Sequence, residues 1–108
     1  MSTSGEVLIE RLLTTTIRAE ANDLHLAVGQ KPTVRHQRGL GQLETEALTQ
    51  DDMMSLVECI TPDRYRREIQ EKGGVHFAHG FCGVRFRVAV FRQCGQLGMV
   101  FRRSGFPA

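Results

Sequence analysis

The spacing of hydrophobic residues along the chain shifts between a helical period and a strand period. Residues 6–20 carry apolar side chains at helical spacing, which predicts an amphipathic helix. Ser4 is placed to act as its N-cap, and Asn22 is expected to end it, since Asn tolerates the left-handed conformation. Residues 23–28 then alternate polar and apolar side chains. This alternation predicts a half-buried strand with His25 on its exposed face.

Two more short strands are expected before the helical period returns. One covers residues 33–37 and the other ends near Leu43, with glycine and proline marking the turns between them. Thr49 and Asp52 resemble a capping box, so a second helix is expected to begin at Thr49. We interpret its apolar stripe, together with the neighbouring Cys59, as core residues: Met53, Leu56, Val57 and Ile60.

The rest of the sequence predicts one more helix and then only strands. Thr61 would cap a third helix with Pro62 at its first helical position, and Gly73 would end that helix. From Gly74 onward apolar and polar residues alternate. Because helices and strands are segregated along the chain, we expect an α+β fold. Its sheet would be mainly antiparallel, with about six strands flanked by about three helices.

The last two predicted strands carry the most informative polar residues. Cys94-Gly95 suits a two-residue hairpin loop, and this loop places Val88 opposite Phe101 as a core pair. On the other face of the same hairpin, Arg87 lies directly opposite Arg102. The hairpin is therefore expected to bring two positive charges together.

Two arginines directly opposite each other in a sheet repel by roughly a few tenths of a kcal/mol. An anion between Arg87 and Arg102 would reverse the sign of that interaction, because guanidinium groups suit phosphate oxygens. Arg85, two residues along on the same face, is a third candidate. The pattern leaves open the alternative that these exposed arginines only keep the strand soluble.

Charge is distributed unevenly along the chain. The 108 residues have a formal net charge of +2. Residues 73–108 hold five Arg and no Asp, Glu or Lys, which leaves nine basic and twelve acidic groups in the first 72 residues. Such asymmetry is typical of a face for an anionic partner.

Cysteine usage and hydropathy bear on the compartment. There are three Cys and no Cys-x-x-Cys pair, which argues against a disulfide framework and for a reducing cytoplasm. The N-terminus has no signal pattern, and no apolar run approaches the roughly 20 residues that span a bilayer.

A set of short motifs occurs in a fixed order along residues 6–103. They are Ala21-Asn22-Asp23-Leu24-His25-Leu26, Gly29, Pro32, Arg35, Gly74-Val75-His76-Phe77-Ala78, Arg85-Phe86-Arg87-Val88-Ala89-Val90-Phe91-Arg92 and Val100-Phe101-Arg102. This ordered set closely resembles the N-terminal domain of the type II secretion and type IV pilus motor ATPases. Within that family it resembles in particular the twitching-motility retraction (PilT-like) ATPases.

The resemblance implies a PAS-like domain over residues 1–103, followed by the start of a linker over 104–108. The linker would lead to a RecA-like ATPase domain within a homohexamer. It also implies that Arg87 and Arg102 reach nucleotide phosphates held by that ATPase domain. Such a motor would be cytoplasmic and peripheral to the inner membrane, which it would meet through the pilus or secretion platform.

The sequence departs from the family pattern in places. His76 stands where the family commonly has an acidic residue, and Arg103-Ser104-Gly105-Phe106-Pro107 replaces the usual Arg-x-Ile-Pro ending. Nothing like Gly-x-x-x-x-Gly-Lys-Ser/Thr is present, so we expect this chain alone to be no ATPase and to bind no cofactor. ATP and Mg would belong to the parent protein.

Other residues of the chain have side chains that could support different chemistry. His76, His79 and Cys82 are metal-ligand types, but the two histidines would face opposite sides of one strand, so no metal site is expected unless a loop at Gly80-Phe81 intervenes. Nucleic-acid binding is not expected, since exposed aromatics are scarce among the arginines. A stand-alone PAS-like regulatory or ligand-binding module is the alternative function.

Overall fold

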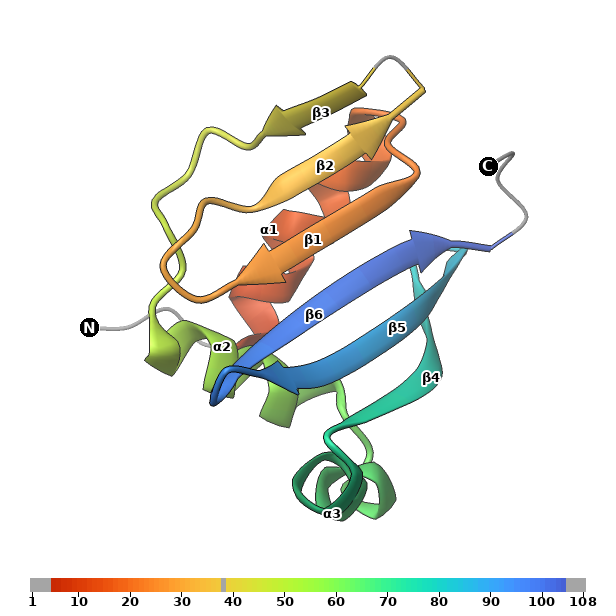
Figure 1. Ribbon diagram of the computed structural model, residues 1–108. Coiled ribbons are helices and arrows are strands. Elements are labelled where there is room, and N and C mark those ends of the chain that lie inside the picture. The colour runs from red at the N-terminus through yellow and green to blue at the C-terminus, as the bar shows by residue number, and fades with distance from the viewer. Residues whose placement is uncertain (1–4, 38, 105–108) are drawn as a thin grey trace.

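The order of helices and strands in the computed structural model is the one that the sequence predicts. The structure describes residues 5–37 and 39–104; the expected cap Ser4 and most of the expected linker lie outside these ranges. The elements are α1 (Gly5–Arg18), β1 (Asp23–Ala27), β2 (Thr33–His36), β3 (Gly39–Gln42), α2 (Gln50–Ile60), α3 (Asp63–Lys72), β4 (Gly74–Phe81), β5 (Val84–Gln93) and β6 (Gln96–Arg103) (Figure 1).

The strands form one six-stranded antiparallel sheet in the order β3-β2-β1-β6-β5-β4. Each half of the sheet is a local meander, and the two halves meet where β1 pairs with β6. Helices α1 and α2 lie behind the sheet in Figure 1, and α3 lies next to β4. The expected α+β fold is confirmed. One face of the sheet is covered by helices, and the other is open.

The predicted register of the β5–β6 hairpin is confirmed. Arg87 is the direct partner of Arg102, and Val88 is the direct partner of Phe101. The loop residues Cys94 and Gly95 have φ values of 53° and 78°, as a two-residue turn with both residues left-handed requires. The β4–β5 hairpin has the same kind of turn at Cys82–Gly83. The loop considered at Gly80-Phe81 does not form, because β4 continues through both residues.

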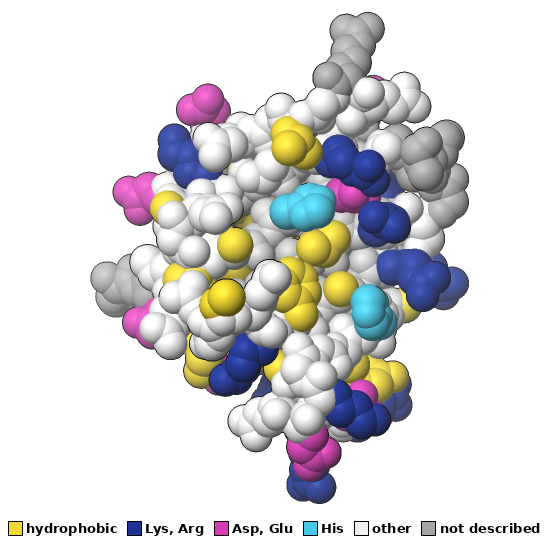
Figure 2. All heavy atoms as spheres, in the orientation of Figure 1, with side chains coloured by type: hydrophobic (Ala, Val, Ile, Leu, Met, Phe, Trp, Pro, Cys, Tyr) yellow, Lys and Arg dark blue, Asp and Glu magenta, His cyan; other side chains and the backbone are white. Residues whose placement is uncertain are grey.

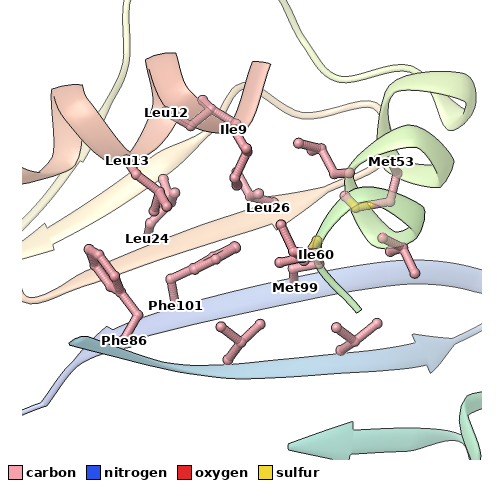
Figure 3. Packing of buried hydrophobic residues seen from close by; sticks show 14 of the residues in the cluster. Ile9, Leu12, Leu13, Leu24, Leu26, Met53, Ile60, Phe86, Met99 and Phe101 are labelled. Atoms are coloured by element: carbon pink, nitrogen blue, oxygen red, sulfur yellow. The ribbon is translucent and has the colours of Figure 1, made fainter. Parts of the chain in front are cut away.

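The hydrophobic core lies between the helices and the covered face of the sheet. In Figure 3 side chains from β1, β5 and β6 point toward α1 and α2. Phe86 and Phe101 are fully buried and meet edge to face, with ring centroids 6.1 Å apart. Members of this core labelled in Figure 3 are Ile9, Leu12, Leu13, Leu24, Leu26, Met53, Ile60, Phe86, Met99 and Phe101.

The predicted capping box of α2 is confirmed. The Asp52 N–H donates to Thr49 Oγ1 at 3.0 Å, and the Thr49 N–H donates to Asp52 Oδ2 at 2.9 Å. The stripe of α2 predicted for the core is buried. Cys59 was expected there too, and this is wrong: the residue is exposed, because it lies about 100° around the helix from Ile60. Partial desolvation of its thiol, and secondly the negative charge of Glu6, raise the pKa of Cys59.

Two predicted helix ends differ from the structure. Thr61 does not cap α3: its backbone N–H donates to Val57 at the end of α2, and its buried hydroxyl has no partner among the described residues. Pro62 is the N-cap instead. Asn22 does not end α1 either, because Glu20 adopts the left-handed conformation with φ of 54°. Gly73 ends α3 as predicted, with φ of 83°.

Substituting Gly5 by alanine is expected to lower the free energy of unfolding by about 1 to 3 kcal/mol. A Cβ at Gly5 would collide with the backbone oxygen of Ser55 and lie 3.2 Å from the Cβ of Cys59. Helix α1 would have to move away from α2. The free-energy cost of this movement outweighs the roughly 1 kcal/mol by which alanine stabilises a helix relative to glycine. Urea unfolding measures the change. Thr15→Ala, on the exposed side of α1, is the control, and equal stability of the two variants would contradict the expectation.

Candidate anion-binding site

The open face of the sheet is the one turned toward the viewer in Figures 1 and 2. Figure 2 shows hydrophobic side chains at its centre, two histidines beside them and a group of basic side chains along one border. An acidic side chain is visible among the basic ones. The charged residues of this face therefore gather at one end of the strands.

Four charged residues lie in one row across this face. Arg35 of β2 is the register partner of Asp23 of β1, which is the partner of Arg102 of β6, and Arg102 is the partner of Arg87 of β5. Strands lie about 4.8 Å apart and register partners share a face, so these side chains are immediate neighbours. The row thus holds three positive charges and a single carboxylate, which contacts Arg35 and Arg102.

The carboxylate of Asp23 is almost wholly buried. Its side chain is 2% exposed, and Oδ2 accepts hydrogen bonds from Arg35 Nε at 2.7 Å and pairs with Arg35 Nη2 at 2.6 Å. The Nε of Arg102 donates to Oδ1 over a longer 3.4 Å. His25 Nε2 lies 3.7 Å from Oδ2. Arg35 is therefore the main partner of the Asp23 carboxylate, and Arg102 makes a longer and weaker contact.

Arg87 and Arg85 lie on the side of Arg102 that faces away from Asp23. Both are exposed, and with His76 and Ser104 they line a hollow of about 320 Å³. Among the described residues, no carboxylate forms an ion pair with either arginine. The predicted register, with Arg87 opposite Arg102, is confirmed. Arg102 itself lies between the hollow and the buried carboxylate of Asp23. Contact with phosphate stays a prediction for all three arginines.

Sequence reasoning missed Asp23. Its partnership with Arg35 could have been found, because both residues are on the outward positions of two strands joined by a short turn. Its contact with Arg102 is between residues 79 positions apart, and nothing in the alternation pattern indicates which strand neighbours β1. His25, by contrast, is exposed as expected.

The histidines of β4 lie on opposite faces of the sheet. His76 is exposed on the open face, whereas His79 is half-buried on the covered side opposite Phe86. In the described part of the chain no three His, Cys, Asp or Glu side chains gather in a way that could hold a metal ion. Burial lowers the pKa of His79 below its ordinary value.

Acidification is therefore expected to destabilise the fold in part through His79. Because its folded-state pKa is lowered, the unfolded chain binds the proton more readily, and stability falls as the pH decreases below about 6.5. The loss stops once the pH is below the folded-state pKa. Unfolding free energies between pH 7.5 and 5 should fall less for His79→Leu than for the unmodified protein. His76→Gln is the control because it leaves the half-buried ring in place, and parallel profiles for His79→Leu and the unmodified protein would contradict the assignment.

A larger hollow of about 630 Å³ lies near the β2–β3 turn, lined in part by Glu20, His36 and Leu40. Its described lining contains no Lys or Arg. The smaller hollow suits an anion, because Arg85 and Arg87 supply charge that guanidinium forks can direct at oxygen atoms. No described helix is long and apolar enough to cross a membrane.

Comparison with known proteins shows what the chain is similar to. No family model matches the chain. It is 32% identical over 95 residues to the type IV pilus retractation ATPase PilT of Pseudomonas aeruginosa, and the match covers 87% of this chain and 28% of PilT. A crystal structure of the pilus retraction motor PilT with bound ADP superimposes with a TM-score of 0.80 at 30% identity, covering 93% of this chain and 29% of that one.

The ATPase DotB of Legionella pneumophila has the same fold. Its TM-score is 0.78 at 15% identity, and the match covers 95% of this chain and 30% of DotB. In each comparison the chain spans less than a third of the relative's length.

Proposed function

This chain is homologous to the N-terminal region of the PilT-like motor ATPases, and from that premise we propose that it contributes arginines to a nucleotide site held by another domain. Residues 1–103 form the PAS-like domain, and 104–108 begin a linker to a RecA-like domain that binds ATP and Mg. The parent protein is a homohexameric ATPase of the cytoplasm. It drives pilus retraction or a related secretion step at an inner-membrane platform.

The observation that carries this proposal is the position of Arg87 directly opposite Arg102 on an uncovered face. Two guanidinium groups held this close repel, and a phosphate between them turns that repulsion into two charge-assisted hydrogen bonds. Phosphoryl transfer spreads negative charge over the oxygens of the transferred group, which such donors stabilise. The domain thereby couples the state of the nucleotide to contacts between neighbouring subunits.

The test is the ATPase rate of the full-length protein carrying Arg87→Ala or Arg102→Ala. A hydrogen bond to a charged group contributes about 1.5 to 3 kcal/mol, so kcat is expected to fall about 10- to 100-fold. Arg92→Ala is the matched control, since Arg92 belongs to the same strand but alternates to the covered face and lies next to Leu97. Near-normal turnover by intact hexamers of both variants would contradict the proposed role.

A further inference from the structure

The buried carboxylate of Asp23 lies directly beneath an arginine that the proposed function places on a phosphate. Asp23 and Arg102 are register partners in β1 and β6. The backbone next to them is also fixed, because the Arg103 N–H donates to the Asn22 carbonyl at 3.0 Å. The position of the carboxylate relative to the stem of Arg102 is therefore set by the sheet and not by a mobile loop.

The atom of Arg102 that meets the carboxylate is Nε, at 3.4 Å from Oδ1. In a guanidinium group Nε is on the stem side, and the two terminal nitrogens lie beyond it. A contact through Nε restricts rotation of the group while it leaves the terminal N–H fork free to bind another anion. The Arg102 side chain is 64% exposed, so that fork is accessible from the open face.

Arg35 completes the arrangement from the other side. It makes the two shortest contacts with Asp23, and its own side chain is 42% exposed. A carboxylate that is 2% exposed requires a charged partner, and Arg35 meets that requirement without Arg102. The positive charge of Arg102 is consequently only partly offset, and the row keeps an excess of positive charge toward Arg87.

Stability alone gives a weak reason for a buried charge at this position, since a well-packed neutral pair is often as stable as a buried ion pair. We propose that Asp23 is a positioning residue: it holds Arg102 by Nε and orients the terminal guanidinium nitrogens toward the phosphate, with Arg35 as the main counter-charge of the carboxylate. This inference rests on the proposed function.

A double-mutant cycle in the full-length protein tests the inference. Asp23→Asn keeps an acceptor of nearly the same shape and removes the charge, and we expect it to lower kcat about 5- to 10-fold with a smaller change in KM. In an Arg102→Ala background the same substitution should change kcat less than twofold, because the group it orients is gone. Asp52→Asn, in the capping box of α2, is the control for a loss of stability without a loss of orientation.

The outcomes separate the two proposals. An equal effect of Asp23→Asn in both backgrounds would assign Asp23 a structural role only and overturn the inference. Normal turnover of Arg102→Ala would remove the proposed function instead. If Asp23→Asn fails to fold, ¹⁵N relaxation of the arginine Nε–H groups in the unmodified chain decides: Arg102 should be more ordered than Arg87 and Arg92. Equal mobility of the three groups would also overturn the inference.

Discussion

Replacing Phe101 by alanine is expected to lower the free energy of unfolding by about 3 to 5 kcal/mol. Phe101 is fully buried in β6, where it is flanked by Leu24 of β1 and Val88 of β5 in register. Its ring also meets Phe86 edge to face, an arrangement worth about 0.5 to 1.5 kcal/mol beyond the area that is buried. The substitution therefore removes contacts from both halves of the sheet at once.

Urea unfolding followed by circular dichroism measures this loss. Since natural domains are stable by only about 5 to 15 kcal/mol, the Phe101→Ala midpoint should shift to far lower urea with an unchanged slope. Phe91→Ala is the control, because Phe91 lies in the same hairpin on the open face and contacts Gly98. A loss at Phe101 no larger than the loss at Phe91 would show that the covered face is not the core.

Replacing Arg35 by alanine is expected to cost about 2 to 4 kcal/mol of unfolding free energy. The substitution removes the two shortest contacts of a carboxylate that is 2% exposed. Arg102 at 3.4 Å and His25 at 3.7 Å remain near that carboxylate. Because these contacts are longer, and because Arg35 itself is partly exposed, the cost lies toward the lower end for a broken buried pair.

The double variant Arg35→Gln/Asp23→Asn gives the contrast. Removing both charges leaves no buried carboxylate without a partner, so this variant should be more stable than Arg35→Ala despite carrying two substitutions. Thermal and urea unfolding of the three proteins make the comparison. Equal stability of Arg35→Ala and the unmodified protein would mean that Asp23 does not need Arg35 as its partner.

Most of the fold could be predicted from the sequence because most of its signals are local. The capping box at Thr49, the end of α3 at Gly73 and the turn at Cys94–Gly95 each depend on residues within a few positions of one another. That turn fixed which residues of β5 and β6 face each other, and the pairing of Arg87 with Arg102 followed from it.

The errors have equally physical causes. Cys59 is next to the apolar stripe of α2 in sequence, but its position about 100° around the helix from Ile60 leaves it exposed. Thr61 resembles an N-cap by residue type, yet it is the C-cap of α2, and Pro62 occupies the N-cap position of α3. In the sequence, Asp23 is indistinguishable from any outward-facing residue of β1. Its contact with Arg102 depends on the pairing of β1 with β6, which brings together positions 79 residues apart.

The open sheet has a consequence for how the protein behaves in concentrated solution. Strand β4 is at one edge, with no described strand on its outer side, and its eight residues include no Lys, Arg, Asp, Glu or Pro. Long uncharged edges of this kind template pairing between molecules. We expect concentration-dependent association by light scattering, reduced in Gly80→Lys, where an added Cβ meets no atom within 4 Å. Identical scattering of the two proteins would show that a free row of peptide groups along β4 does not govern their solubility.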